Sequence, residues 1–446
     1  MKVERRVIAI NLPQFHPFKE NNEWWGMGFT EWTNVTKAKP RYEGHYQPHL
    51  PADMGFYDLR LPEARQLQAD LAKENGIYGF CYYHYWFNGK QLMERPVNEI
   101  IASGEPDFPF MLCWANENWA RNWDGGFKDV LIKQEYSHED DVNHMRWLCE
   151  HVFSDKRYIR VDGKPVFMVY RSSLFPDFEA TVRTWRQVAR EEYGLGLYLL
   201  ESMYPGDPDS TSLATGVDAV MDFQPIGVMM SGLPSEKVRM IDSHEPKEQW
   251  PTVYNYSRYV DYCCATELPD RCYPCVSPGF DNSPRRIGRT FLSFTECTPE
   301  NFGRWLFDSL CRKTCFGSKD ENFVFINAWN EWAEGNHLEP DQKWGRDYLE
   351  ETRQVIDRFK KSGIPDNYEA ERQAKYQYVK ETVILPYQRR LERHQAYSAC
   401  KSRIKNPSVA NEDVRTALRE ARDALPFNMY AELMLKYFIY RIAKIK

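Results

Sequence analysis

Eight short apolar runs, most of them separated by amphipathic stretches, constrain the fold of this 446-residue chain more than any other feature. The last run is β-branched and aromatic and carries no charge, which is typical of a buried parallel strand. The runs span residues 7–12, 77–87, 108–114, 165–170, 196–203, 219–223, 271–276 and 323–328. Between most of them, helical spacing predicts helices over residues 62–74, 138–153, 177–193, 299–315 and 346–361.

Strands that alternate with helices over about 360 residues predict an α/β fold, a (β/α)8 TIM barrel with long βα loops. An open, doubly wound sheet is the alternative, but it would need a Gly-rich phosphate-binding turn after an early strand, and the sequence has none. The segment 13–61 is rich in aromatic residues, Pro and His, and we expect this long loop to cover part of the barrel mouth.

The composition changes after residue 362, where Trp-rich loops give way to Lys, Arg, Glu and Ala in helical patterns. We therefore expect a catalytic domain over residues 1–362 and a helical C-terminal extension over residues 363–446. The last ten residues, 437–446, are both apolar and basic. A weak contact of this end with a membrane surface or a partner protein is left open.

The net charge of -6 is small for this length, so nothing in the composition favours a nucleic-acid partner. The chain starts with charged residues and a short apolar run, and no stretch has the length of a signal peptide core or a membrane span. We therefore expect a cytoplasmic protein. The 11 cysteines include a lone Cys272–Cys275 pair, and core cysteines are favoured over disulfides or a metal.

Two carboxylates follow the eighth run, Glu331 and Glu334, beside Trp329, Asn330 and Trp332. Glutamates in loops are usually solvated charges. A carboxylate pair next to tryptophan is, however, the usual equipment for glycosidic bond chemistry, in which one carboxyl gives a proton while the other accepts one. The position at a barrel strand end favours this catalytic interpretation of Glu331 and Glu334.

Active sites of (β/α)8 barrels lie at the carboxyl ends of the strands, so residues that follow the runs are candidates for substrate binding. We predict that substrate contacts come from Gln14, His16, Trp32, His45, Tyr83, His84, Trp86, Trp114, Asn116, Glu117, Trp119, Asp281, Asn330 and Trp332. His45 and His49 are spaced like metal ligands, but Pro48 lies between them and no His-Glu-x-x-His occurs. We therefore expect neither a catalytic metal nor a cofactor.

Several short sequence motifs together resemble those of the WbsX family. Its members are bacterial proteins of polysaccharide gene clusters and are similar to glycoside hydrolase family 99. The motifs are Leu12-Pro13-Gln14-Phe15-His16, Trp24-Trp25-Gly26, Gly28-Phe29-Thr30-Glu31-Trp32, His45-Tyr46-Gln47-Pro48-His49, Tyr82-Tyr83-His84-Tyr85-Trp86, Trp114-Ala115-Asn116-Glu117-Asn118-Trp119 and Trp329-Asn330-Glu331-Trp332. The resemblance covers about residues 7–359. It implies a (β/α)8 barrel that cleaves internal α-mannosidic linkages with retention of configuration.

The resemblance also implies roles for the two glutamates. Glu331 would act as base on the substrate's 2-hydroxyl, and Glu334 would be the general acid that later activates water. We therefore expect Glu331 to be ionised and Glu334 to hold a proton near neutral pH, in a cleft shared with Glu117 and Trp114. Glycoside hydrolase family 99 commonly has His where this chain has Ala333, so we expect the substrate contacts at that position to differ.

The expected function is a metal-independent, retaining glycoside hydrolase, endo-acting on an α-linked, mannan-like bacterial or host polysaccharide. Two alternatives stay open. One is sugar transfer in O-antigen or capsule biosynthesis, which fits a cytoplasmic location and the name given to WbsX proteins. The other is a non-catalytic carbohydrate-binding protein.

Overall fold

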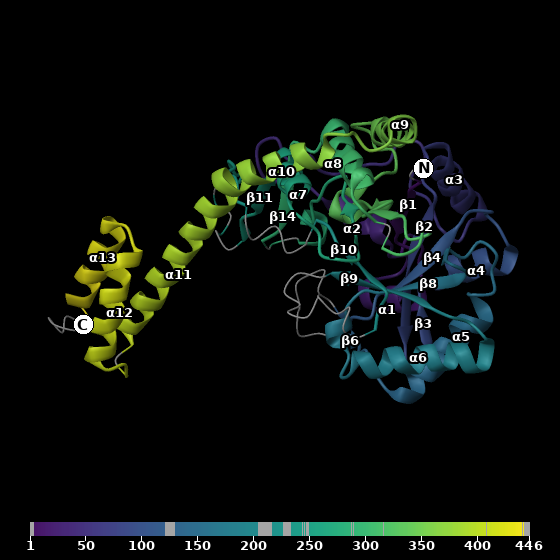
Figure 1. Cartoon of the computed structure of the whole chain (residues 1–446), viewed down its shortest axis with the longest axis horizontal. Coiled ribbons are helices and arrows are strands. Elements are labelled where there is room, and N and C mark those ends of the chain that lie inside the picture. The colour runs from purple at the N-terminus through teal and green to yellow at the C-terminus, as the bar shows by residue number, and fades with distance from the viewer. Residues whose placement is uncertain are drawn as a thin grey trace. The chain divides into compact units, whose positions relative to one another are not determined.

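The computed structural model describes residues 4–120, 130–203, 216–225, 233–242, 244, 246, 249–286, 288, 290–314, 316–406, 408–438 and 440. Parallel strands form a nearly closed barrel in the order β12-β10-β9-β8-β4-β2-β1-β15-β13 (Figure 1). The strands are β1 (Arg6–Asn11), β2 (Gly79–Phe87), β4 (Phe110–Trp114), β8 (Lys164–Val169), β9 (Tyr198–Met203), β10 (Ala219–Asp222), β12 (Cys272–Tyr273), β13 (Cys275–Val276) and β15 (Phe323–Ile326). Each of the eight predicted runs is a strand, and the barrel prediction is confirmed.

The seventh run forms two strands, β12 and β13, because Pro274 interrupts it and has no N–H to donate. The backbone carbonyl groups of residues 271–276 still accept hydrogen bonds from the neighbouring strands β10 and β15. Val220 donates its N–H to the carbonyl of Arg271 at 2.9 Å, and Phe325 donates to the carbonyl of Pro274 at 2.9 Å. The segment 271–276 therefore forms hydrogen bonds with both neighbouring strands of the nearly closed barrel.

Helices follow most strands and cover the outside of the barrel, as Figure 1 shows for the helices around β2, β4 and β8. They are α3 (Pro62–Glu74), α4 (Arg95–Ser103), α5 (His138–His151), α6 (Phe178–Tyr193), α7 (Tyr256–Ala265), α8 (Pro299–Cys311) and α9 (Asp347–Ser362). Their starts are encoded locally: the side chains of Ser137, Asp177 and Thr298 cap α5, α6 and α8. The predicted helix 299–315 ends earlier, at Cys311, where Arg312 becomes extended.

The loops between the barrel strands contain further short helices and strands. The loop after β1 contains α1 (Lys19–Trp25) and α2 (Glu31–Lys37). The short paired strands are β3 (Lys90–Leu92) with β2, β5 (Trp119–Ala120) with β6 (Val130–Ile132), β7 (Arg160–Val161) with β8, β11 (Thr252–Asn255) with β14 (Leu292–Thr295), and β16 (Asn330–Glu331) with β17 (Asn336–His337). The long loops of the barrel are thus structured over much of their described length.

The chain divides into two compact units, of which the first comprises Met1–Ser231 and Ser235–Gln373 and the second Gly232–Pro234 and Ala374–Lys446. The division falls inside α10 (Tyr368–Val379), and the proposed domain boundary after residue 362 stays a prediction. The helical character of the C-terminal extension is confirmed: the π-helical turn η8 (Lys380–Ile384) is followed by α11 (Leu385–Lys405), α12 (Asn411–Ala424) and α13 (Phe427–Tyr437). These helices have a core of their own around Ile404, Val414 and Leu433.

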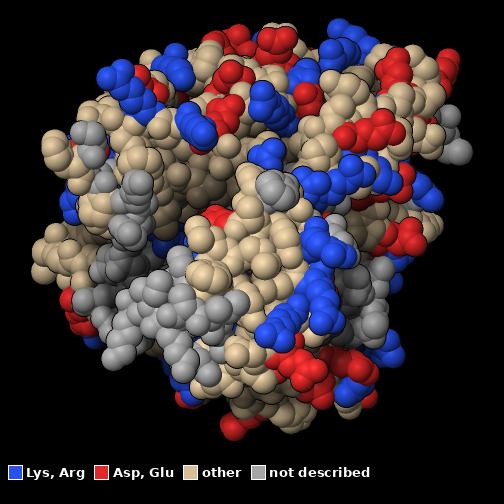
Figure 2. All heavy atoms as spheres, turned by 90° about the vertical axis from the view of Figure 1, so that its left-hand side faces the viewer, with Lys and Arg blue, Asp and Glu red and all other residues tan. Residues whose placement is uncertain are grey.

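Lys and Arg side chains lie among Asp and Glu side chains over the face of the molecule drawn in Figure 2. Among the helices of the described residues, none is long and apolar enough to cross a membrane. The apolar and basic C-terminal end was predicted to contact a membrane or a partner, and residues 441–446 lie outside the described part of the chain.

Candidate active site

One buried guanidinium group holds both predicted catalytic carboxylates. Nη2 of Arg285 donates to Oε2 of Glu331 at 2.9 Å, and Nη1 donates to Oε1 of Glu334 at 2.6 Å. The same guanidinium binds Oε2 of Glu31 through Nε and Nη2, at 3.0 and 2.8 Å. The loops after the first, seventh and eighth strands therefore meet at one charge cluster, Glu31–Arg285–Glu331–Glu334, at the carboxyl end of the barrel.

The backbone after the eighth strand is shaped to present the two glutamates. Glu331 belongs to the β16–β17 hairpin, and Glu334 ends the single 3₁₀ turn η7 (Trp332–Glu334). The next residue, Gly335, has φ +56°, and a side chain there would also meet Asp281 at 3.2 Å and His49 at 3.3 Å. The Asp281 N–H donates to the Glu334 carbonyl at 2.5 Å, so the loop after strand seven fixes this turn.

Asn330 anchors the start of the same turn to the first strand. Its side-chain amide donates to the Leu12 carbonyl at 3.0 Å, and its Oδ1 accepts from the Leu12 N–H at 2.7 Å. The side chain is fully buried. Asn330, which was predicted to contact substrate, therefore joins the end of β1 to the turn that carries Glu331 and Glu334.

The two glutamates differ in exposure. The Glu331 side chain is 9% exposed, whereas that of Glu334 is 22% exposed. Burial raises the pKa of Glu331 to about 8; Arg285 lowers it, and the negative charges of Glu334 and Glu31 raise it further. This raised pKa runs against the expectation that Glu331 is ionised near neutral pH in the free protein.

The aromatic strand β2 sends its side chains to two different sides. Tyr83 and Tyr85 are close enough to Glu331 for its charge to raise their pKa further, beyond the larger effect of burial. His84 and Trp86 point the other way, toward α5, because successive side chains of a strand alternate between its faces. Tyr83 and Tyr85 are therefore on the face of β2 that is turned toward Glu331, and the substrate contact expected of Tyr83 stays a prediction.

His84, Trp86 and Trp114 are not brought to the site. They pack with His144 of α5, at ring distances of 5.1, 4.5 and 4.6 Å. Trp86 donates its indole N–H to Asp140, and Trp114 is only 1% exposed. These side chains fill the layer between barrel and helices, so the expected cleft shared by Glu331, Glu334 and Trp114 is wrong.

The residues after the third strand have separate partners. Asn116 is buried and links the loop to the fourth strand, since its Nδ2 donates to the Arg171 carbonyl at 2.6 Å and its Oδ1 accepts from the Arg171 N–H at 2.8 Å. Glu117 is exposed and pairs with the Arg171 guanidinium at 3.0 Å. Trp119 packs edge-on against Tyr85 at 5.4 Å, which connects it to the site through that ring.

Trp32 and Trp332 support the site from behind. Trp332 is 1% exposed and stacks on His337 at a ring distance of 3.8 Å. Trp32 is 8% exposed and packs on Trp332 at 5.4 Å. Neither indole offers an open face to a sugar ring, so both support the turn that carries Glu331 and Glu334.

The remaining predicted contacts come from the loop after β1 and from Asp281. Gln14 and His16 are buried, and His16 donates from Nδ1 to the Pro13 carbonyl at 2.8 Å. His45 donates from Nε2 to Asp281 at 2.5 Å, since its Nδ1 accepts the Arg41 N–H. Burial alone would raise the pKa of Asp281, but His45 and a hydrogen bond from Gln47 lower it. Asp281 is therefore an anchoring carboxylate.

The similarity of this chain to known proteins shows which family it belongs to. Residues 7–352 match the family described as Glycosyltransferase WbsX. The chain belongs to the WbsX family. Two proteins of Xanthomonas campestris pv. campestris, from strains B100 and ATCC 33913 and both called "Uncharacterized protein WxcX", are 40% identical over 356 residues. That match covers 79% of this chain and 50% of each relative, so the chain spans about half the length of the curated relatives it matches.

Solved structures with a similar fold are more distant from this WbsX-family chain. A "Glycoside hydrolase-like protein" has a TM-score of 0.48 at 15% identity, over 79% of this chain and 94% of that one. The GH99 endo-alpha-mannosidase from Bacteroides thetaiotaomicron has a TM-score of 0.48 at 12% identity, over 80% of this chain and 98% of that one.

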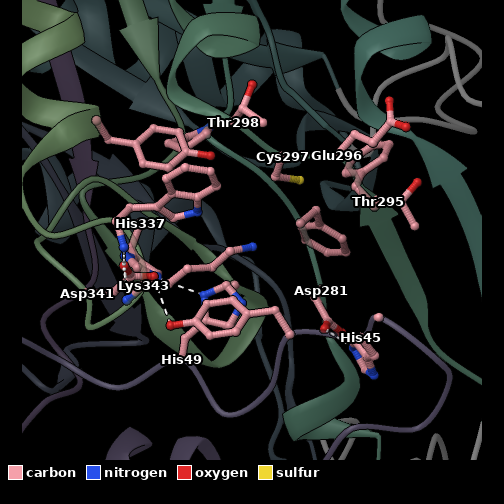
Figure 3. A pocket seen from close by; sticks show the side chains of 18 of the residues that line it. His45, His49, Asp281, Thr295, Glu296, Cys297, Thr298, His337, Asp341 and Lys343 are labelled. Atoms are coloured by element: carbon pink, nitrogen blue, oxygen red, sulfur yellow. Dashed lines mark hydrogen bonds and ion pairs between the residues drawn. The ribbon is translucent and has the colours of Figure 1, made fainter.

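A cavity of about 300 Å³ adjoins the turn of this WbsX-family protein that carries Glu331 and Glu334, and Gly335 and Asp281 line it. Figure 3 shows Asp281 among the lining side chains. Its other lining side chains include Tyr42, Tyr46, His49, Phe294, Thr295, Glu296, Cys297, Thr298, His337, Asp341, Lys343, Trp344 and Tyr348. Aromatic rings mixed with hydroxyl and charged groups are suited to a polar, ring-shaped ligand such as a sugar.

The site residues predicted from the sequence did not include Glu31, Arg285 or Glu339. Glu31 belongs to one of the sequence motifs that resemble the WbsX family, and Arg285 follows the seventh apolar run. Their positions in the sequence were therefore a weak indication of a role in the site. Glu339 is buried, and its carboxylate accepts from Tyr57, Gln68 and Trp332 at 2.6 to 2.8 Å. Burial raises the pKa of Glu339 to about 7 despite these donors.

Proposed function

We propose that this protein is a retaining glycoside hydrolase that acts within an α-linked, mannan-like polysaccharide, with Glu331 and Glu334 as its catalytic pair. The observation that carries the proposal is the joint binding of both carboxylates to Arg285 at the end of the eighth barrel strand. Glycosidases need two carboxyl groups held at a fixed separation on either side of the reacting bond. A shared guanidinium provides that fixed separation here.

The proposed roles follow the family resemblance and are supported by the different surroundings of the two groups. Ionised Glu331 takes the proton of the substrate 2-hydroxyl, whose oxygen attacks the anomeric carbon and forms a 1,2-anhydro sugar. The glycosidic bond breaks, and Glu334 gives its proton to the leaving oxygen. Glu334 then takes a proton from water, which opens the anhydro ring, and protonated Glu331 returns its proton to the sugar. Two inversions give overall retention.

The raised pKa of Glu331 supports the base role. A carboxylate whose conjugate acid has a pKa of about 8 is a stronger base toward a sugar hydroxyl than an ordinary glutamate, and catalysis works best when this pKa is near the working pH. The greater exposure of Glu334 supports its role, because its partners, the leaving group and a water molecule, enter from solvent.

A second candidate function is sugar transfer in O-antigen or capsule assembly. The family description, Glycosyltransferase WbsX, favours it. The two functions differ in what accepts the sugar: water in hydrolysis, a growing glycan in transfer. A carbohydrate-binding protein without turnover is the third outcome.

A single screen separates the three. The purified protein is incubated with α-mannans and with O-antigen fragments, each with and without nucleotide sugars. Reducing ends released without a donor support hydrolysis, whereas chain growth that depends on a donor supports transfer. Glu334→Gln is the matched control, because contaminating activity would survive that substitution. Binding without any turnover would refute the catalytic proposal.

A further inference from the structure

Three potential metal ligands lie together in the wall of the cavity next to the catalytic turn. They are His49 from the loop after β1, His337 from β17 and Asp341 from the segment that follows. Each offers a ligand atom, and these atoms lie within 4.8 Å of one another. His337 and Asp341 are buried, and Figure 3 shows all three side chains along one side of the cavity.

The spacing of the two imidazoles suits one shared ion. Nδ1 of His49 lies 3.0 Å from Nε2 of His337. Two nitrogen ligands that are each about 2.1 Å from a metal lie about 3.0 Å apart at a right angle and about 3.4 Å apart at the tetrahedral angle. The observed distance therefore falls at the short end of the range for neighbouring ligands.

The tautomer of His337 is already set for metal binding. Its Nδ1 donates to the Glu339 carbonyl at 2.9 Å, so Nε2 carries a lone pair directed at His49. Metal-binding histidines nearly always donate their second ring N–H in this way. The orientation of one ligand is thus fixed by the protein itself.

Asp341 is held by its backbone surroundings. Its Oδ1 accepts from the N–H groups of Lys343 and Trp344, at 3.0 and 2.6 Å. Within the described part of the chain, its Oδ2 accepts a long hydrogen bond of 3.3 Å from the Tyr46 hydroxyl, so a carboxylate oxygen retains capacity for a cation. The nearby Lys343 ammonium lies over the rings of Tyr46 and Trp344, at 4.7 and 4.9 Å, and its charge would weaken binding without occupying the site.

We propose that His49, His337 and Asp341 bind a divalent transition metal ion of the Zn²⁺ type, with the remaining position facing the cavity. Two imidazoles and one carboxylate are a ligand set that such ions prefer. The ion joins the loop after β1 to the β16–β17 hairpin. It is a positioning ion, because His337 stacks on Trp332 next to Glu331 and the ligands do not include either catalytic glutamate. The expectation that no metal takes part in the chemical step stays a prediction.

The test uses the full chain after treatment with a chelator and dialysis. Titration with ZnCl₂ in a calorimeter should give one bound equivalent, and CoCl₂ should produce the visible absorption bands of a nitrogen-ligated ion. His49→Gln and Asp341→Asn should each weaken Zn²⁺ binding by more than about 10-fold. Removal of groups that merely support a metal ligand already weakens binding about 10- to 100-fold. His151→Gln, which changes an exposed histidine of α5, is the matched control and should bind like the wild type.

Circular dichroism confirms that each variant is folded before titration. His49→Gln is the decisive variant, because His337 packs on Trp332 and its substitution affects the fold directly. Equal Zn²⁺ binding by the wild type and a folded His49→Gln protein, or no binding by the wild type, would overturn the proposal and leave a simple imidazole–imidazole hydrogen bond. Neither result depends on whether the protein hydrolyses a glycan.

Discussion

Glu331→Gln should change how the stability of this protein depends on pH. In the folded protein burial raises the pKa of Glu331 to about 8, whereas an unfolded glutamate ionises near its ordinary value of 4.5. Below pH 4.5 both states hold the proton, and the group has no effect. Between pH 4.5 and 8 the unfolded chain loses the proton and the folded protein keeps it, so folding becomes progressively less favourable. Above pH 8 this cost is complete.

The size of the effect follows from the same two values. A difference of about 3.5 pKa units corresponds to on the order of 5 kcal/mol, at about 1.4 kcal/mol for each unit. Gln cannot ionise but still offers an oxygen to Arg285, so the variant escapes most of this cost. The free energy of unfolding of Glu331→Gln relative to the wild type should therefore rise by several kcal/mol from pH 4.5 to pH 8.

Urea denaturation followed by tryptophan fluorescence at several pH values measures this difference. Glu179→Gln is the matched control, because that carboxylate is exposed on α6 and pairs with Arg183 one turn along the helix. Its effect should be within about 1 kcal/mol of the wild type, as for most surface ion pairs. A stability difference for Glu331→Gln that stays flat or shrinks as the pH rises would refute the reasoning.

Three further predictions concern the same cluster. The value of kcat/KM for glycan hydrolysis should follow a bell-shaped pH profile, because the proposed step needs ionised Glu331 and protonated Glu334 together; a profile without a falling limb at high pH would contradict the acid role of Glu334. Glu334→Gln should lose on the order of 10²–10⁴-fold in rate on a glycan, and much less on an aryl glycoside whose leaving group needs no proton; equal losses would contradict the acid role. Arg285→Met should cost about 3–5 kcal/mol in unfolding free energy, the usual effect of breaking a buried ion pair, whereas Arg304→Met, in an exposed pair with Asp261, should cost at most about 1 kcal/mol.

The barrel could be predicted because its strands are short apolar runs at regular intervals, and this pattern needs no knowledge of long-range contacts. The seventh strand was predicted as one run, although Pro274 within it was a readable sign of an interruption. The end of α8 at Cys311 was missed because the sequence continues with residues that tolerate a helix, and tertiary contacts of Arg312 with the Cys263 and Cys264 carbonyls end it there.

The position of Glu331 and Glu334 after a strand could be predicted, but their partners could not. Arg285 and Glu31 are 254 positions apart in sequence, and a single sequence carries no signal for such a pair. The side of β2 that faces the site was also unreadable, since Tyr82, Tyr83, His84, Tyr85 and Trp86 are all aromatic. A strand without alternation of polar and apolar residues does not reveal which face is inside.

The order of strands around the barrel has a consequence for synthesis on the ribosome. β1 pairs with β2 on one side and with β15 on the other, so its second edge stays open until residue 326 has been made. At about 5–20 residues per second, the interval between the completion of β2 and of β15 lasts about 10–50 s. Throughout that time the nascent sheet exposes an apolar edge that can pair with another chain. A ribosome that stalls within this interval would therefore release a fragment prone to aggregation, whereas one that stalls after residue 334 would release a chain that contains every strand of the barrel.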